Sequence, residues 1–105
     1  MSFEDITILV PTWNRSKFLP LFLLNVANQS YPKHHLKIII DDDGTDAFIK
    51  DIDPVRAALG EVELTYITGK PRRSIGKKRH DLIKACKTKV FCFVDDDDIY
   101  LPTYI

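Results

Sequence analysis

The chain has 105 residues, which is enough for one domain spanning residues 1–105 and too few for two. A hydrophobic fraction of 45% and a charged fraction of 29% are ordinary for globular proteins and exclude a chain that is disordered throughout. The formal net charge of +0 argues against a general nucleic-acid or anionic-membrane binder. Charge is nevertheless segregated, because acids gather in residues 41–46 and 95–98 and bases in residues 70–79.

Targeting and redox signals are weak. Cys86 and Cys92 have neither CxxC spacing nor a matching histidine pattern, which predicts reduced core residues rather than a zinc site. The N-terminal segment Met1–Asp5 is acidic and lacks the basic flank of a signal peptide, and no apolar run approaches the ~20 residues of a membrane span. These features predict a cytoplasmic protein without a transmembrane segment.

The first half of the chain predicts a strand, a helix and a second strand. The β-branched run Ile6–Val10, ended by Pro11, is typical of a buried strand. Ser16 is the expected N-cap of an amphipathic helix. The apolar stripe of that helix is Leu19, Phe22, Leu23, Val26 and Ala27. Leu36–Ile40 then predicts the second strand, which leads into a polar turn.

The second half continues the alternation. Phe48, Ile49 and Ile52 suggest a short helix, with Asp53-Pro54 as its cap and first turn and Gly60 as its stop. A third strand is expected at Val62–Thr68 and a fourth at Val90–Val94. Between them, a helix is expected from Ile75 or Gly76 to Cys86. Its inward side chains are predicted to be Leu82, Ile83 and Cys86.

This order predicts an α/β fold in which helices cover both faces of a mostly parallel sheet. Ligands of such sheets bind beyond the carboxyl ends of the strands. Three polar segments follow predicted strands and should therefore meet at that edge: residues 11–15, 41–46 and 95–98.

The run Asp95–Asp98 is the strongest candidate site. Four adjacent carboxylates repel one another, and a hard divalent cation such as Mg²⁺ or Mn²⁺ relieves that repulsion while bridging the protein to a diphosphate. The cation would also neutralise charge on a departing diphosphate. The alternative is a solvated acidic turn that caps a following helix, which we would prefer for one or two aspartates but not for four.

The other segments have less specific patterns. An acid in Asp41–Asp46 is placed to accept a hydrogen bond from a ribose or base, for example from the N3–H of uracil, but an Asx-rich turn is an equal alternative. Trp13 is placed to stack on a base or simply to pack. Within the basic segment we single out Arg79, while the histidines show no ligand or triad spacing.

These residues resemble family 2 glycosyltransferases of the GT-A fold, a Rossmann-like βαβαβαβ arrangement. The resemblance covers Ile6 to Pro102. It is carried in order by Val10–Arg15, Asn28–Pro32, Ile38–Asp46, Gly76–Arg79 and Phe93–Pro102. It implies the N-terminal, nucleotide-sugar-binding half of an enzyme that transfers a sugar, with inversion, from a donor such as a UDP-sugar to an acceptor hydroxyl, with Mn²⁺ or Mg²⁺ as cofactor.

The resemblance also implies residue roles. The nucleotide would be bound by Pro11, Thr12, Trp13, Asn14, Asp42, Arg79, Asp95 and Asp96. Asp95-Asp96-Asp97 matches the DXD motif, with Asp97 as the principal metal ligand and Asp95 as a second one. Asp43 stands where the family usually has glycine, and a shift of one residue would select Asp43 rather than Asp42 for the base.

The resemblance places the acceptor site and the general base beyond Ile105, with Asp98 only a remote substitute. An alternative is therefore a non-catalytic nucleotide-binding or assembly module, which would bind a donor without turnover. A half-domain that exposes the face meant for its partner is also expected to self-associate. A phospho-accepting receiver domain is disfavoured, because its acids follow the first and third strands.

Overall fold

The computed structural model describes residues 5–14, 16–27, 32–69 and 71–94. The element order is β1 (Ile6–Thr12), the 3-10 turn η1 (Ser16–Phe18), α1 (Leu19–Ala27), the 3-10 turn η2 (Lys33–His35), β2 (Leu36–Asp42), α2 (Ile52–Leu59), β3 (Glu63–Ile67), α3 (Ile75–Ala85) and β4 (Val90–Phe93). The strands form one parallel sheet in the order β3-β2-β1-β4. The predicted α/β architecture is therefore confirmed.

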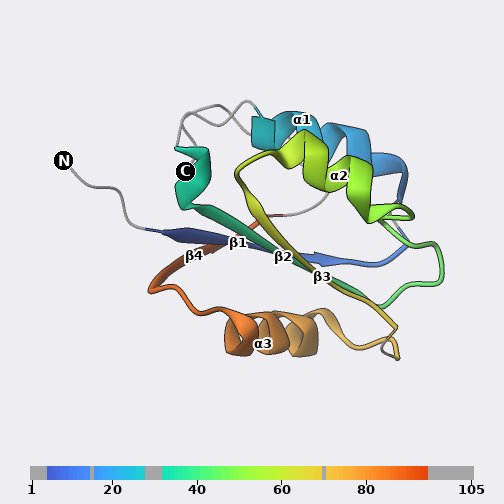
Figure 1. Cartoon of the computed structure of the whole chain (residues 1–105). Helices are drawn as coiled ribbons and strands as arrows, with labels where there is room; N and C mark the ends of the chain where they lie inside the picture. The colour runs from blue at the N-terminus through green and yellow to red at the C-terminus, as the bar shows by residue number, and fades with distance from the viewer. Residues whose placement is uncertain (1–4, 15, 28–31, 70, 95–105) are drawn as a thin grey trace.

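Two helical layers enclose the sheet. Helices α1 and α2 cover one face and α3 covers the other, as Figure 1 shows. The larger core lies on the α1/α2 side and includes Ile8, Val10, Ile38 and Ile40, whereas a smaller core of Leu9, Ile39 and Leu82 lies on the α3 side. Even-numbered residues of β1 and β2 thus face α1 and α2, and odd-numbered residues face α3.

Strand β1 continues through Pro11 to Thr12, so the prediction that Pro11 ends the strand is wrong. Pro11 pairs with Asp41 and Thr12 with Asp42 in the β1–β2 ladder. Within the described residues, the pairing of β1 with β4 ends at Leu9, so Pro11 has no described strand neighbour on that side. A proline is tolerated at such a position, because its missing N–H costs no ladder hydrogen bond there.

The helices differ from expectation in three details. Helix α1 begins at Leu19, after the 3-10 turn that starts at Ser16, so the helix starts two residues later than an N-cap at Ser16 would place it. Helix α2 begins at Ile52 with Asp51 as its N-cap instead of Asp53, because the Asp51 carboxylate accepts the N–H of Asp53. Ile83 is 43% exposed rather than inward.

The segment before α2 is also not helical. Phe48 and Ile49 belong to an irregular stretch, yet both side chains are buried in the larger core. Phe48 packs edge-to-face on Phe22 with ring centroids 5.9 Å apart. In the described part of the chain, no helix is long and apolar enough to cross a membrane.

Candidate nucleotide site at the carboxyl edge

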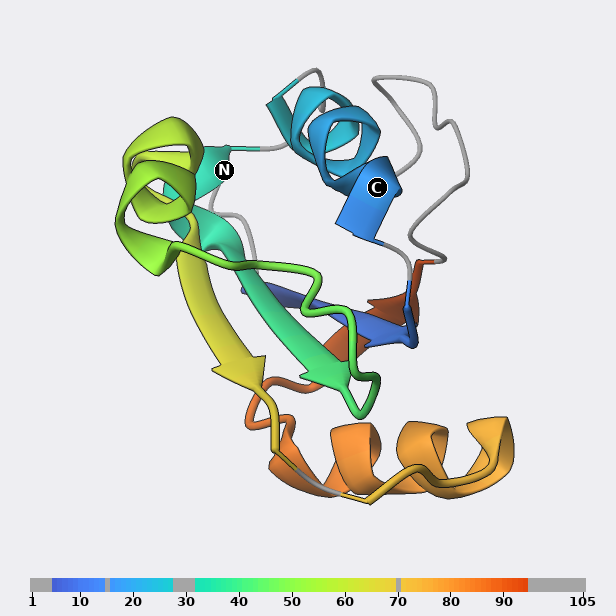
Figure 2. The ribbon, with the colours of Figure 1, turned by 90° about the vertical axis from the view of Figure 1, so that its right-hand side faces the viewer.

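Polar segments meet where the parallel strands end. The ends of β1, β2 and β3 are neighbours in the sheet, and Figure 2 looks onto this edge. On the other side of β1, the Val94 N–H donates to the Leu9 carbonyl at 3.0 Å. The run Asp95–Asp98 begins at the next residue and itself lies outside the described residues. The first two predicted segments therefore converge as expected.

Asn14 links the loops after β1 and β2. Its Oδ1 accepts the N–H groups of Thr45 and Asp46, both at 2.8 Å, while its backbone takes a positive φ of 51°. A Cβ at Gly44 would lie 2.5 Å from that Oδ1 and 2.6 Å from the Asn14 nitrogen. Close approach therefore requires glycine at position 44. Asn14, predicted to bind nucleotide, fixes the shape of this edge.

Asp42 points to the α1/α2 side and organises the loop that follows β2. One carboxylate oxygen accepts the Gly44 N–H at 3.0 Å. The other accepts the Phe48 N–H at 2.8 Å and the Tyr66 hydroxyl at 2.6 Å. Burial, followed by the hydrogen bond to Asp42, raises the pKa of Tyr66, so the hydroxyl stays protonated and donates.

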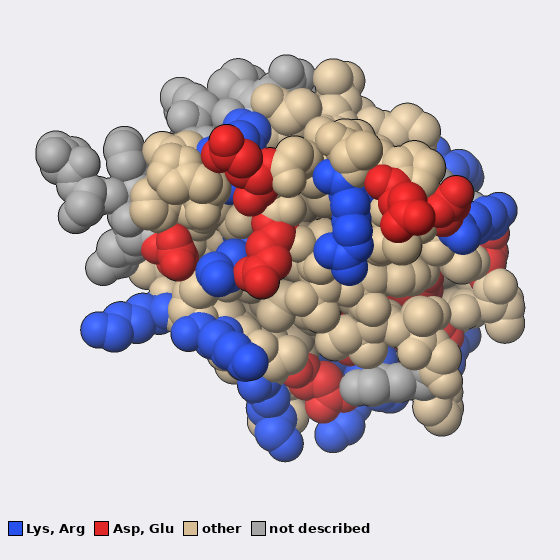
Figure 3. Space-filling model, viewed as in Figure 1, with Lys and Arg blue, Asp and Glu red and all other residues tan. Residues whose placement is uncertain are grey.

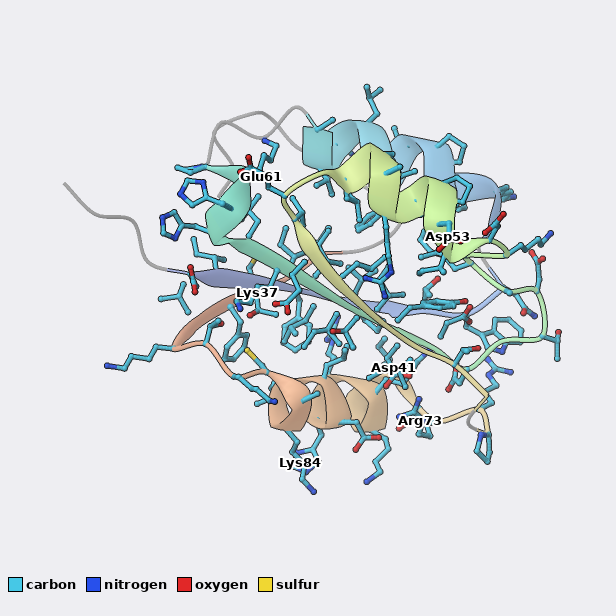
Figure 4. The ribbon with its side chains drawn as sticks, viewed as in Figure 1. Lys37, Asp41, Asp53, Glu61, Arg73 and Lys84 are labelled. Atoms are coloured by element: carbon cyan, nitrogen blue, oxygen red, sulfur yellow. The ribbon has the colours of Figure 1, made fainter. Side chains whose placement is uncertain are left out.

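Asp41 and Asp43 point to the α3 side and form what we call the buried ion cluster, with Arg73, Lys78 and Asp81. The Arg73 guanidinium pairs with Asp41 and, at 2.6 Å, with Asp81. The backbone N–H of Arg73 donates to Asp43 at 2.6 Å. Lys78 donates to Asp43 and to the Thr12 carbonyl, both at 3.0 Å. Figure 4 shows Asp41 and Arg73 close together between the sheet and the start of α3.

The cluster favours the charged forms of Asp43 and Arg73. Burial raises the pKa of Asp43, but the Arg73 N–H and the Lys78 ammonium outweigh it and hold that pKa below its ordinary value. The hydrogen bond to Asp41 raises the pKa of Arg73. Within the described residues, the second Asp41 oxygen and the Arg73 Nε are buried without a hydrogen-bond partner, although Nε lies 3.8 Å from an Asp43 oxygen. The cluster thus retains unused hydrogen-bonding capacity beside the candidate site.

A cavity of about 540 Å³ opens next to this cluster. Its lining residues are Trp13, Arg72, Arg73, Ser74, Ile75 and Lys78. The Arg72 guanidinium lies over the Trp13 indole, 3.9 Å from the ring centroid, and Trp13 is 38% exposed. Ser74 caps α3 by accepting the Lys77 N–H at 3.2 Å, so the helix N-terminus forms part of the wall. A flat ring beside cations suits a nucleotide.

The remaining predicted residues have other positions. Pro11 and Thr12 are buried in β1, so Trp13 is the residue of this segment whose side chain is exposed at the cavity. Arg79 is exposed and lies over the Phe93 ring, 5.5 Å from its centroid, at the end of β4 rather than in the cavity lining. Asp95, Asp96, Asp97 and Asp98 lie outside the described residues, and within the described ranges no three potential ligands group as a metal site.

Sequence reasoning missed Lys78, Arg73 and Tyr66. A signal for Lys78 existed, since it lies four residues before Leu82 and therefore on the inward stripe of α3. A lysine on an apolar stripe predicts a buried partner. Arg73 had no such signal, because it lies outside any helix or strand and its two partners on the sheet side, Asp41 and Asp43, are about 30 residues away in the sequence.

Comparison with known proteins identifies the family. The model for glycosyl transferase family 2 matches residues 7–105, nearly the whole chain. The chain belongs to this family. Among its relatives, the poly(ribitol-phosphate) β-N-acetylglucosaminyltransferase TarS of Staphylococcus aureus is 30% identical over 95 residues. The poly(ribitol-phosphate) β-glucosyltransferase of Bacillus spizizenii is 32% identical over 97 residues. These matches cover 88% and 89% of this family 2 chain, but only 16% and 15% of the relatives.

Solved structures show that this family 2 chain has the GT-A fold. A crystal structure of S. aureus TarS 1–349 in complex with UDP-GlcNAc matches with a TM-score of 0.75 and 23% identity, covering 93% of this chain and 28% of that one. A Pyrobaculum calidifontis mannosyltransferase in complex with GDP-Man and Mn²⁺ matches with a TM-score of 0.77 and 21% identity, covering 94% and 29%. The predicted family and fold are confirmed.

Proposed function

We propose that the chain binds a nucleotide-diphosphate sugar at the carboxyl edge of its sheet, for inverting transfer of the sugar to an acceptor hydroxyl by a family 2 enzyme. The observation that carries the proposal is the cavity between Trp13 and the start of α3, since a family 2 chain places it where parallel sheets bind ligands. A UDP-sugar is the favoured donor. The reported complexes of the similar TarS structure with UDP-GlcNAc and with UDP support it.

The nucleoside is assigned to the loop after β1. The base stacks on Trp13 and takes the place of the Arg72 guanidinium, which now covers that ring. Arg72 is then free to bind a phosphate oxygen. Pro11, Thr12 and Asn14 support this loop: the first two belong to β1, and Asn14 ties the loop to residues 45 and 46.

The acid that accepts from the base is either Asp42 or Asp43. Asp42 already accepts three protein hydrogen bonds and points away from α3, so a base contact would use its remaining acceptor capacity. Asp43 pairs with Lys78, which lines the cavity. This position favours Asp43 as the acceptor. It corresponds to the motif alignment shifted by one residue, in which the aspartate that replaces the usual glycine faces the base.

The diphosphate is assigned to the acidic run. Its donor set of four adjacent carboxylates fits a hard divalent cation, and we assign Asp97 and Asp95 as ligands of Mn²⁺ or Mg²⁺. When bound, the cation neutralises charge on the departing diphosphate. Asp96 is assigned to the ribose or sugar. The guanidinium of Arg79 lies at the end of β4, just before the acidic run, and is assigned to approach the nucleotide from there.

Calorimetric titration of the chain with UDP, with and without Mn²⁺, tests the proposal. We expect Mn²⁺ to strengthen UDP binding strongly, and we expect Asp97→Ala to abolish this metal-dependent binding while the circular dichroism spectrum stays unchanged. Glu61→Ala is the matched control, because Glu61 is an exposed acid far from the carboxyl edge (Figure 4). Equal Mn²⁺-dependent affinity in Asp97→Ala would refute the metal assignment, and no binding by the unmodified chain would refute the proposal itself.

A further inference from the structure

Lys78 is an unusual residue for the inner face of a helix. Its side chain is 6% exposed, and burying an ammonium is costly unless it is paired and hydrogen-bonded. Asp43 supplies the charge partner and the Thr12 carbonyl a second acceptor, each at 3.0 Å. An ammonium has three donors, so one remains after these two contacts.

The position of Lys78 indicates where that third donor is used. Lys78 lines the cavity together with Trp13, and its contact to Thr12 holds it directly behind the loop that carries the indole. A ring stacked on Trp13 would present its edge toward the buried end of the cavity. The group that completes Lys78 must be an acceptor, because an ammonium cannot accept a hydrogen bond.

The local charge favours a neutral ligand edge over a phosphate. Asp43 matches the charge of Lys78, and Asp41 and Asp81 match the charge of Arg73. The buried part of the cavity wall therefore offers no surplus positive charge to a diphosphate. A ring carbonyl is the neutral acceptor that a nucleobase carries on its edge.

We propose that Lys78, held in place by Asp43 and Thr12, donates a hydrogen bond to a ring carbonyl of the nucleobase and thereby selects oxo bases over amino bases. This inference rests on the proposed donor site. An amino group at the same position of the ring would place a donor against a donor and leave the buried ammonium unsatisfied. Desolvation of unpaired polar groups gives strong discrimination in such sites.

Thio-substituted nucleotides separate this contact from others. Cytosine differs from uracil at N3 as well as at C4, so CDP alone would not distinguish Lys78 from an acid that reads N3–H. In 4-thio-UDP and 2-thio-UDP, one carbonyl oxygen becomes a poorer acceptor while N3–H is kept. The full chain is titrated with UDP and both analogues in the presence of Mn²⁺.

We expect one analogue to bind at least about fivefold more weakly than UDP, and the other to bind like UDP. Lys78→Met should weaken UDP binding about 10- to 100-fold and remove the difference between the analogues. Lys77→Met is the matched control, because Lys77 is the adjacent lysine, 57% exposed and outside the cavity lining, and it should preserve both values. If Lys78→Met unfolds the chain, Asp43→Asn/Lys78→Met removes the buried pair together and must give the same loss of discrimination.

Three results would overturn the inference. The first is equal affinity of the unmodified chain for UDP and both thio analogues. The second is a weaker affinity for one thio analogue that persists in the Lys78 variants. The third is a loss of affinity in Lys78→Met that is equally large for UDP and for inorganic diphosphate. In each of these cases UDP still binds the unmodified chain, so the donor proposal survives. Absence of UDP binding by the unmodified chain would instead refute both.

Discussion

Asp42 and Asp43 are neighbours in the sequence but have different partners, because successive side chains along a strand point to opposite faces. Asp42 organises the loop after β2 through Gly44, Phe48 and Tyr66. Asp43, directly after β2, contacts α3 through Lys78. It also contacts the loop between β3 and α3 through Arg73. A choice between the two as the base acceptor therefore depends on the face of the sheet that the ligand occupies.

Trp13→Ala should weaken UDP binding about 5- to 150-fold, since stacking of a base on an aromatic side chain is worth about 1–3 kcal/mol. The loss should also appear for UDP titrated without metal at high concentration, because stacking does not involve the diphosphate. Leu24→Ala, at a 56% exposed residue of α1, controls for the loss of exposed apolar surface. Unchanged affinity in Trp13→Ala would mean that the indole only packs against Arg72.

Gly44→Ala should lower the free energy of unfolding by about 1–3 kcal/mol, as overpacking does. The added methyl would lie 2.5 Å from the Asn14 Oδ1 and 2.6 Å from its backbone nitrogen. Gly76→Ala is the matched control, because a Cβ there meets nothing within 4 Å. Urea denaturation of both variants measures the difference, and equal stability would show that the two loops separate without cost.

At the scale of the elements, the segment between β3 and α3 is held by charge rather than by apolar packing. Arg73 reaches from this segment to Asp41 at the end of β2 and to Asp81 within α3. The smaller core on this face has only Leu9, Ile39 and Leu82 as its buried members in the described part of the chain. The ion cluster therefore supplies much of what fixes the start of α3 against the sheet.

Arg73→Met should lower the free energy of unfolding by about 3 kcal/mol, because removing one partner leaves buried carboxylates uncompensated. Lys37→Met removes an exposed pair with Glu63 between β2 and β3 and should cost less than about 1 kcal/mol. Thermal and urea unfolding of the two variants provide the comparison. Similar losses in both would show that the ion cluster contributes no more than a surface pair.

The strands were predictable because buried parallel strands are continuous apolar runs, as in Ile6–Val10 and Leu36–Ile40. Their last residues were not, because Pro11 and Asp41 join the ladder through cross-strand pairing that no local pattern reveals. Helix α2 shows the same limit. Phe48 and Ile49 fit a helical stripe, but they are buried because the hydrogen bond to Asp42 and packing on Phe22 place them there.

At the scale of the whole molecule, the surface matches a formal net charge of +0. Figure 3 shows acidic and basic side chains interspersed over one face, with basic side chains more frequent along its lower edge, where α3 lies. The described part of this face therefore creates no strong field of one sign. Recognition of an anionic donor should therefore depend on local groups at the carboxyl edge and on the metal.

The location of the candidate site followed from topology, since residues 11–14 and 41–46 lie at the carboxyl ends of neighbouring parallel strands and meet at one edge. The side-chain contacts within the candidate site did not follow, because Arg73 and Lys78 reach partners at the ends of β1 and β2 that are about 30 or more residues away. Roles carried by the family resemblance, such as those of Asp42, Arg79 and Asp97, stay predictions. Binding measurements on single variants are needed to test them.

The central claim is that a nucleotide binds at the carboxyl edge, and amide chemical-shift mapping of the isotopically labelled chain with UDP and Mg²⁺ tests it most directly. We predict the largest shifts at Thr12–Asn14, Gly44 and Arg72–Lys78, which include the residues that line the cavity and the loop residues that adjoin them. Amides at the opposite edge, such as His34–Leu36 and Thr88, should not move. Shifts concentrated at that opposite edge, or no shifts at saturating UDP, would contradict the account.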